Sequence, residues 1–218
     1  MNPERKLVGR WTAAFSLAYV AGMLFTSAPD VLQFPGVEVV WTGARGAFAF
    51  GLMGLIQGFA LKEAGRDVSV SLFTAWTSAA GLVSYMAIRW TLESIGYSTD
   101  ASGRAHLSVT LLSALMIGLG LAAAQMIPLR KALPRTWAWP AAVSGVWALG
   151  LTLESGIGAA ASRWSGTDAQ FIGGVLQGAL VCMTIGGLSG AAASVLTKPG
   201  DTNEQSRRTD ETGEGHRC

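Results

Sequence analysis

Residues 107–129 read LSVTLLSALMIGLGLAAAQMIPL and contain no charged side chain. An α-helix needs about 20 mostly apolar residues to cross a hydrocarbon core about 30 Å thick. A membrane-spanning β-strand would instead alternate apolar and polar residues, and this stretch does not alternate. Residues 107–129 therefore predict a transmembrane helix.

Further uncharged stretches of similar character follow one another along the chain. They cover residues 11–29, 46–61, 68–88, 136–153 and 169–197. The shortest of them reaches a spanning length if Arg45 lies at the membrane interface and extends its charged head into water. Charged residues make up 14% of the chain, against roughly 25% in soluble domains. We therefore expect an all-α, polytopic membrane helix bundle with six transmembrane helices within residues 1–198.

A fragment that begins with tryptophan recurs three times, as WTAA at residues 11–14, WTSA at 76–79 and WPAA at 139–142. The steps between the copies are 65 and 63 residues, which suits a hairpin of two spanning helices. Self-similarity at a fixed period indicates repeated structural units, here three tandem two-helix repeats with pseudo-threefold symmetry. The predicted units cover residues 11–64, 76–131 and 139–198. Because each unit has an even number of spans, all copies share one orientation, as in a parallel repeat about an axis along the membrane normal.

The basic residues are divided unevenly between the two predicted sides of the membrane. Twelve of the sixteen fall on one side, namely Arg5, Lys6, Arg10, Lys62, Arg66, Arg130, Lys131, Arg135, Lys198, Arg207, Arg208 and Arg217. Arg45, Arg89, Arg104 and Arg163 fall on the other. Cytoplasmic loops carry the excess of Lys and Arg. We therefore expect a multi-pass protein of the bacterial cytoplasmic (inner) membrane with both termini in the cytoplasm.

The two ends of the chain differ from the predicted spans. Residues 199–218 hold eight charged residues and, apart from Pro199, no aliphatic or aromatic side chain, so we expect a disordered cytoplasmic tail. The basic start and the small residues Thr26-Ser27-Ala28 resemble a secretory signal with its cleavage site. The repeat opposes that alternative, because the fragment at residues 11–14 has internal counterparts that cannot be signals.

One polar residue occupies the same slot near the end of each repeat: Gln57, Gln125 and Ser189. A polar side chain deep in lipid normally faces the interior of the bundle. The three residues form either hydrogen bonds between helices or a candidate polar axis that binds a small solute. We expect the first, and therefore no shared cavity wide enough for a solute.

Three carboxylates fall near the outer ends of the odd-numbered helices: Asp30, Glu93 and Glu154. Rings of Asp and Glu attract cations in cation channels, so these residues are a candidate outer acidic ring. The alternative is that they solvate helix ends at the interface, paired with Arg89 or Arg163. The sequence favours this second interpretation without excluding the first.

Small residues four positions apart mark candidate helix-packing faces. They are Ala47 and Gly51, Gly54 and Gly58, and Gly186 and Gly190. Helix association in lipid depends on van der Waals packing, and small residues let the backbones approach closely. The alternative is a narrow pore lined by exposed backbone, and we expect packing.

The residue types needed for catalysis are scarce. His106 is the only histidine outside the tail, and Cys182 and Cys218 form no metal-ligand spacing. No nucleophile with a base and no phosphate-binding loop is recognisable. We expect no enzyme, no cofactor, no metal site and no nucleic-acid partner, with the lipid bilayer and other membrane proteins as surroundings.

Tryptophans gather near the predicted ends of the spans. They include Trp11, Trp41, Trp76, Trp90, Trp137 and Trp139. Tryptophan is enriched at both membrane–water interfaces. We therefore expect these residues to form interfacial aromatic belts.

Two of the predicted units close a Gly-rich helix in the same way, as Gln-x-x-x-Leu61-Lys62 and Gln-x-x-x-Leu129-Arg130, with tryptophans opening the next span. This pattern resembles a loose group of uncharacterised bacterial multi-span membrane proteins, in which the helix often reads Gln-Trp-Leu-Val-Leu-Arg. The best match is Gly118–Gly150, with methionine in place of the usual tryptophan at position 126. The resemblance implies a multi-span topology and no activity.

The function favoured by the sequence is a non-enzymatic one, an accessory or helix-packing component of a membrane assembly. The alternative is a small-solute or ion carrier or channel. A wet cavity on the axis between the second, fourth and sixth helices would favour the carrier, and a dry axis the accessory role.

Cysteine accessibility tests the predicted topology in a variant that lacks the native cysteines. We expect Ser102→Cys to react with an impermeant thiol reagent from outside, and Ser206→Cys to react only after the membrane is opened. Labelling of position 102 from the cytoplasmic side alone would overturn the topology.

Overall fold

The computed structural model describes residues 3–24, 37–94, 107–133, 137–161 and 167–197. Over these residues the chain is all-α. The six helices are α1 (Pro3–Leu24), α2 (Val37–Glu63), α3 (Val70–Ser94), α4 (Leu107–Leu129), α5 (Ala138–Ala161) and α6 (Thr167–Leu196). The predicted tail, residues 199–218, and the signal-like segment at residues 26–28 lie outside the described residues.

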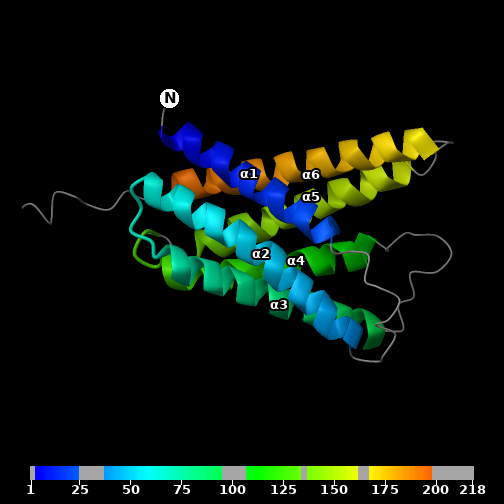
Figure 1. The fold of residues 1–218 in the computed structure, drawn as a ribbon, viewed down its shortest axis with the longest axis horizontal. Helices are drawn as coiled ribbons and strands as arrows, with labels where there is room; N and C mark the ends of the chain where they lie inside the picture. Colours follow the sequence, from blue (N-terminus) through cyan, green and yellow to red (C-terminus); the bar gives the residue numbers. More distant parts are fainter. Residues whose placement is uncertain (1–2, 25–36, 95–106, 134–136, 162–166, 198–218) are drawn as a thin grey trace, which may run out of the picture.

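The helices run back and forth along the long axis of the molecule, so that odd-numbered helices start where even-numbered helices end (Figure 1). Each helix packs against its neighbours in sequence, and α1 also packs against α6, which closes a ring. The most extensive of these contacts joins α2 to α3. That contact lies between two predicted repeats and not within one, so the repeat itself stays a prediction.

Four of the described helices are long and apolar enough to cross a membrane. These segments are Val39–Glu63, Val70–Thr91, Val109–Leu129 and Val175–Leu196. The helices α1 and α5 are not among these four segments of the described residues. The chain is therefore a multi-pass membrane protein, and six spans remain a prediction.

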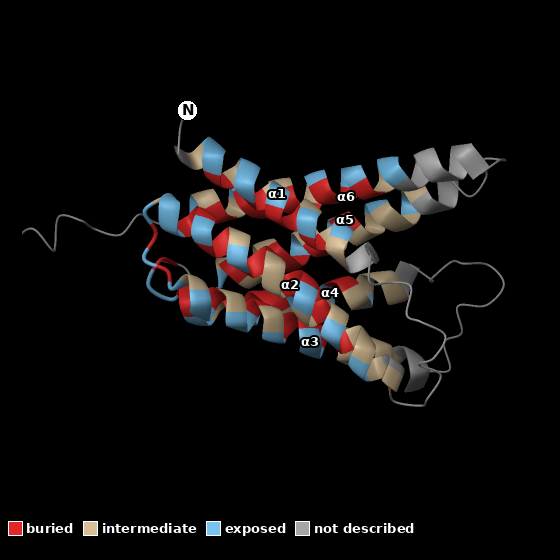
Figure 2. Ribbon diagram, in the orientation of Figure 1, coloured by how far each residue is buried: buried red, intermediate tan, exposed pale blue. Residues whose placement is uncertain are grey.

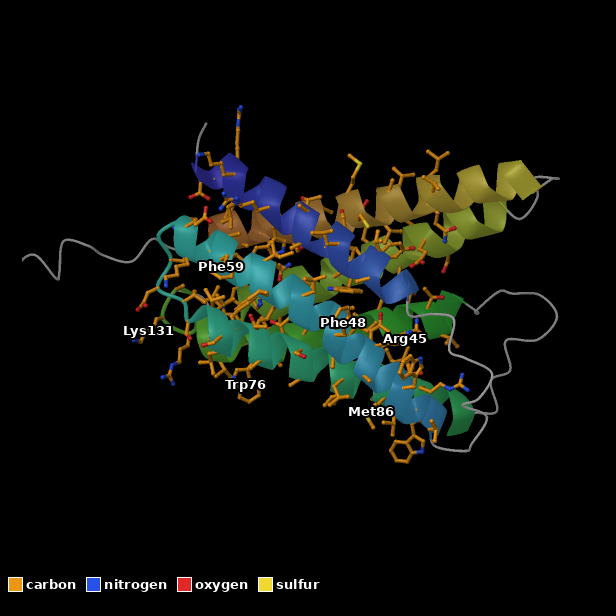
Figure 3. The ribbon with its side chains drawn as sticks, in the orientation of Figure 1. Arg45, Phe48, Phe59, Trp76, Met86 and Lys131 are labelled. Atoms are coloured by element: carbon orange, nitrogen blue, oxygen red, sulfur yellow. The ribbon has the colours of Figure 1, made fainter. Side chains whose placement is uncertain are left out.

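The bundle has a mainly apolar core with several buried polar residues, and its surface exposes many large apolar side chains. Buried polar residues of the helices include Gln57, Thr77, Ser84, Gln125, Ser144 and Ser189. Exposed apolar residues, one from each helix, include Leu17, Phe48, Val83, Leu119, Leu149 and Val195. Figure 2 shows the buried positions on the inward faces of the helices, and Figure 3 shows Phe48 and Phe59 along α2. A surface with this much exposed apolar area suits lipid and not water.

The contact between α2 and α3 is a backbone-to-backbone approach at two glycines. A Cβ atom placed on Gly46 would lie 2.5 Å from the Gly81 carbonyl oxygen, and a Cβ atom on Gly81 would collide with the Gly46 carbonyl oxygen. Nearby, the Ser78 hydroxyl donates a 2.8 Å hydrogen bond to the Ala47 carbonyl oxygen. Only glycine permits this approach, which brings two helices into close van der Waals contact.

Gly46 and Gly81 were not among the predicted packing residues. The glycines that were predicted to pack also face a neighbouring helix. Gly51, Gly54 and Gly58 face Ser78, Thr77 and Val70 of α3, and Gly186 and Gly190 face Thr12 and Trp11 of α1. A Cβ atom would lie between 2.8 and 3.3 Å from the nearest of these atoms at every position. Each of these glycines therefore packs directly against a residue of the neighbouring helix.

The loop after α2 ties three parts of the ring together at the basic end of the bundle. Gly65 has a φ of 76°, and hydrogen bonds from its N–H to Lys62 and from the Arg66 N–H to Leu61 end the helix in a Schellman motif. The turn directs Arg66 inward, where its side chain is 1% exposed. Its Nη2 atom donates to Glu4 Oε1 of α1 at 2.9 Å and to the Ser194 carbonyl oxygen of α6 at 3.4 Å.

Further ion pairs at the same end are exposed. Arg10 pairs with Glu63, and Lys131 Nζ lies 3.7 Å from Asp67 Oδ2. Exposed pairs contribute roughly 0–1 kcal/mol each. The buried Arg66 contact is therefore the stronger constraint on this end.

The predicted aromatic belt is wrong for two tryptophans. Trp11 and Trp139 are 1% and 0% exposed, and their rings meet edge to face at 6.2 Å. Phe73 joins them, with its ring 6.4 Å from that of Trp11. A buried indole needs a partner for its N–H, and Trp11 has one in Ser189. Trp90 and Trp137 are 70% and 72% exposed, as a belt position requires.

A pair of glycine-to-alanine variants tests the close approach of α2 and α3. We expect Gly81→Ala to lower the midpoint of thermal unfolding in detergent, since overpacking costs typically about 1–3 kcal/mol and the obstacle is backbone. The control is Gly145→Ala on α5, where a Cβ atom would meet nothing within 4 Å. Alanine is favoured over glycine in helices by about 1 kcal/mol, so this control should melt at the wild-type temperature or above. Equal melting of the two variants would contradict the close-approach interpretation.

Candidate functional site

The three residues of the candidate polar axis lie close together. Gln57 and Gln125 are 2% exposed and Ser189 is 7% exposed. All three line one small void of about 10 Å³, together with Trp11 and Trp139. A single water molecule needs about 10–15 Å³ of such space. The void is therefore too small for an organic solute.

We name Gln57, Gln125 and Ser189 the polar layer. Hydrogen bonds link two of these residues to neighbouring helices. The Trp11 Nε1–H donates to Ser189 Oγ at 3.0 Å, joining α1 to α6. Gln125 Nε2 donates to Thr77 Oγ1 at 3.5 Å, joining α4 to α3. Gln57 Oε1 is buried without a hydrogen-bond partner among the described residues. This layer acts mainly as a set of links between helices.

A larger cavity, which we name the central cavity, lies next to this small void and shares part of its lining. Its volume is about 270 Å³. It is lined by residues from all six helices: Phe15, Ala18, Tyr19, Arg45, Ala49, Phe50, Met53, Tyr85, Ile117, Trp147, Leu151, Glu154, Val181 and Ile185. The central cavity is thus bordered by the whole ring and not by one hairpin.

One wall of the central cavity is a continuous row of aromatic rings. Phe15 meets Trp147 edge to face at 5.5 Å, and Trp147 stacks on Phe50 at 5.7 Å. Phe50 in turn meets Tyr85 edge to face at 5.9 Å. These separations are typical of favourable aromatic pairs. The four rings come from α1, α5, α2 and α3, so the wall depends on ring closure.

Two groups of opposite charge, Arg45 and Glu154, line the same cavity from α2 and α5. Tyr19 of α1 and Glu154 of α5 interact on this wall of the cavity. Gln177 Nε2 donates to the Glu154 carbonyl oxygen at 3.1 Å, which fixes this turn of α5 against α6. Figure 3 shows Arg45 toward the opposite end of the bundle from Lys131. The central cavity therefore combines one cationic, one anionic and several aromatic groups.

The candidate acidic ring is only partly visible. Glu154 lines the central cavity. Asp30 and the side chain of Glu93 lie outside the described residues. The ring hypothesis therefore stays untested, but Glu154 belongs to a site of mixed charge.

A thin partition separates the central cavity from the polar layer. Phe15, Met53, Trp147 and Ile185 line both spaces. Ile185 fills the position that a side chain on Gly150 would occupy. The partition is made entirely of apolar side chains, so a polar solute in the central cavity does not reach Gln57 in this conformation.

Sequence reasoning missed most of the central cavity. The structure places Arg45 on α2 and on the cavity wall, while its expected position at the membrane interface stays a prediction. An ionisable residue within a spanning helix is a functional-site signal in itself, and Arg45 carried that signal. Tyr19 and Tyr85 gave none, because their convergence depends on the packing of helices distant in sequence. In the part of the chain that the structure describes, no group of His, Cys, Asp and Glu side chains could hold a metal ion.

Two substitutions test which side chains of the polar layer stabilise the bundle through hydrogen bonds between helices and which can be replaced by an apolar side chain. We expect Ser189→Ala to lower the free energy of unfolding by about 1–3 kcal/mol, because it leaves the buried Trp11 N–H without its acceptor. We expect Gln125→Leu to retain near-native stability, because its described hydrogen bond is at the long limit and an apolar side chain suits the site. Thermal unfolding in detergent measures both, and a larger loss for Gln125→Leu would reverse the assignment.

The sequence matches no known protein family, no curated protein and no solved structure at a significant level.

Proposed function

We propose that this multi-pass membrane protein binds a small solute in the central cavity and performs no chemistry on it. The observation that carries the proposal is a cavity of about 270 Å³ lined by Arg45, Glu154 and a wall of aromatic rings. Ligand sites are typically concave, mostly apolar and furnished with a few polar groups. The central cavity has that composition.

The energetics of the bundle support a binding role. Helices in lipid associate through close packing, and an unfilled space sacrifices packing contacts. Ionisable residues within spanning helices are costly and mark functional sites by default. Arg45 and Glu154 line the unfilled space, so the lost packing contacts and the two costly ionisable side chains occur at the same place. Binding of a ligand there would offset both unfavourable terms.

The cavity also bears on the choice between the functions weighed from the sequence. A wet cavity on the axis between the second, fourth and sixth helices was the feature expected of a carrier, and a dry axis the feature expected of an accessory component. The polar layer is filled, but the central cavity is bordered by α2, α4 and α6 among others. The carrier or solute-binding alternative is therefore the better supported of the two.

We further propose the inner-membrane, six-span arrangement with three hairpin repeats and both termini in the cytoplasm. Two observations support it. The helices α1 and α5 each lie between two neighbours of the closed ring, which would place them in the same bilayer. The basic residues Arg10, Lys62 and Lys131 lie at the end where Arg66 joins the ring. In this arrangement the central cavity faces away from the cytoplasm.

A matched pair of variants tests solute binding. The purified protein is screened by thermal unfolding in detergent against a panel of amino acids, betaines, amines, carboxylates and sugars. We expect at least one class to raise the melting temperature of the wild type and of Ala44→Leu, whose position on α2 is exposed. The same solute should not stabilise Ala49→Leu, because leucine would occupy the cavity that Ala49 lines.

Two results would contradict the proposal. One is a panel in which no solute shifts the melting temperature. The other is a shift that Ala49→Leu retains in full, which would place the binding elsewhere. Co-purification of a stoichiometric membrane partner together with the first result would establish the accessory role instead.

A further inference from the structure

We propose that the ligand of the central cavity is a small zwitterion that carries an alkylated ammonium group and an anionic group. This inference rests on the proposed function and deepens it by naming the chemical class of the solute. The observation behind it is the joint presence of Arg45, Glu154 and the aromatic wall around one space.

The charges of the cavity lining set the net charge of the ligand. Arg45 and Glu154 line the same space, so a solute that carries both signs can place each of its charges near a group of opposite charge. A guanidinium group binds carboxylate and phosphate through a fixed fork of donors. The carboxylate of Glu154, which interacts with Tyr19, attracts the cationic group of the same solute.

The aromatic wall sets the type of cation. Phe15, Trp147, Phe50 and Tyr85 present ring surfaces along one side of the cavity. Quaternary ammonium groups are recognised by such rings through cation–π attraction, with tryptophan the best partner. A primary ammonium needs up to three hydrogen-bond acceptors. The wall supplies ring faces in abundance and few acceptors, which favours an alkylated ammonium.

The volume of the cavity limits the size of the ligand. A space of about 270 Å³ is roughly twenty times the about 10–15 Å³ that a single water molecule needs. It has room for a small zwitterion of about ten non-hydrogen atoms, each of which takes no more space than a water molecule. Such a group exists as a free solute and also as a lipid headgroup.

A set of near-isosteric probes tests the charge requirement. γ-Butyrobetaine carries both charges, butyltrimethylammonium only the cation, 5,5-dimethylhexanoate only the anion, and 4-aminobutyrate a primary ammonium. Calorimetry on the purified wild-type protein in detergent measures their affinities. We expect γ-butyrobetaine to bind at least tenfold more tightly than each of the other three.

Variants of the lining assign each charge to its partner. Glu154→Gln should weaken γ-butyrobetaine and butyltrimethylammonium at least tenfold and leave 5,5-dimethylhexanoate unchanged. Arg45→Gln should weaken γ-butyrobetaine and 5,5-dimethylhexanoate and spare the cation. Tyr85→Phe keeps the ring and should bind like the wild type, whereas Tyr85→Leu should lose affinity for both ammonium probes. The melting temperature of each variant without ligand identifies any that are misfolded, and the Tyr85→Phe and Tyr85→Leu pair then carries the test alone.

A competition experiment separates the two sources of the zwitterion. Dihexanoylphosphatidylcholine presents a trimethylammonium group and a phosphate on a short lipid. If it displaces γ-butyrobetaine at a lower concentration than free glycerophosphocholine does, the site takes a lipid headgroup. If both compete equally, the site takes a free solute. Each result supports a zwitterion ligand.

The inference fails if butyltrimethylammonium, 5,5-dimethylhexanoate or 4-aminobutyrate binds as tightly as γ-butyrobetaine. It also fails if Glu154→Gln does not weaken the binding of γ-butyrobetaine and butyltrimethylammonium. In that event binding that Ala49→Leu abolishes would still support the proposed function. If neither these probes nor the wider panel bind, the proposed function fails as well.

Discussion

The arrangement of the bundle depends on the approach of two helix backbones at Gly46 and Gly81. Lipid tails are as apolar as leucine, so burial of apolar side chains gives helices in a bilayer no reason to associate. Contact between backbones, with many weak dispersion contacts over a short distance, supplies the attraction instead. The α2–α3 contact is the most extensive in the ring, and the other helices are positioned around this pair.

Interior polarity then determines which helices become neighbours. Trp11 and Ser189 join the first helix to the last, and Arg66 joins both of them to the loop after α2. Each of these groups would be costly to bury without its partner. Glycine contacts bring helices close without strong preference for a particular partner, whereas the buried donors and acceptors select one arrangement. The central cavity is the space that the large side chains around this ring leave between them.

The sequence was a good guide to the helices and a poor one to the site. The uncharged stretch at residues 107–129 coincides with α4, because an apolar run of that length has few alternatives in a membrane. The glycine pairs four residues apart were identifiable as packing positions and do face neighbouring helices, but Gly46 and Gly81, where the backbones approach most closely, belong to no such predicted pair. By contrast, Tyr19 and Tyr85 meet around one cavity only after α1, α2, α3 and α5 have assembled. Spacing along the chain holds no information about such a meeting, and it also misplaced Trp11 and Trp139, whose burial depends on contacts with other helices.

The hydrogen bond between Trp11 and Ser189 spans 178 residues of sequence, and this separation bears on how the protein is made. A ribosome completes α1 long before α6 exists, so the first helix enters the membrane without the neighbour that accepts its indole N–H. Loop-closure entropy must be spent before such a distant contact forms. Closure of the ring therefore waits for α6, and the central cavity, which residues of all six helices line, is complete only when that helix is in place. A nascent chain that still lacks α6 thus has neither the closed ring nor the finished cavity.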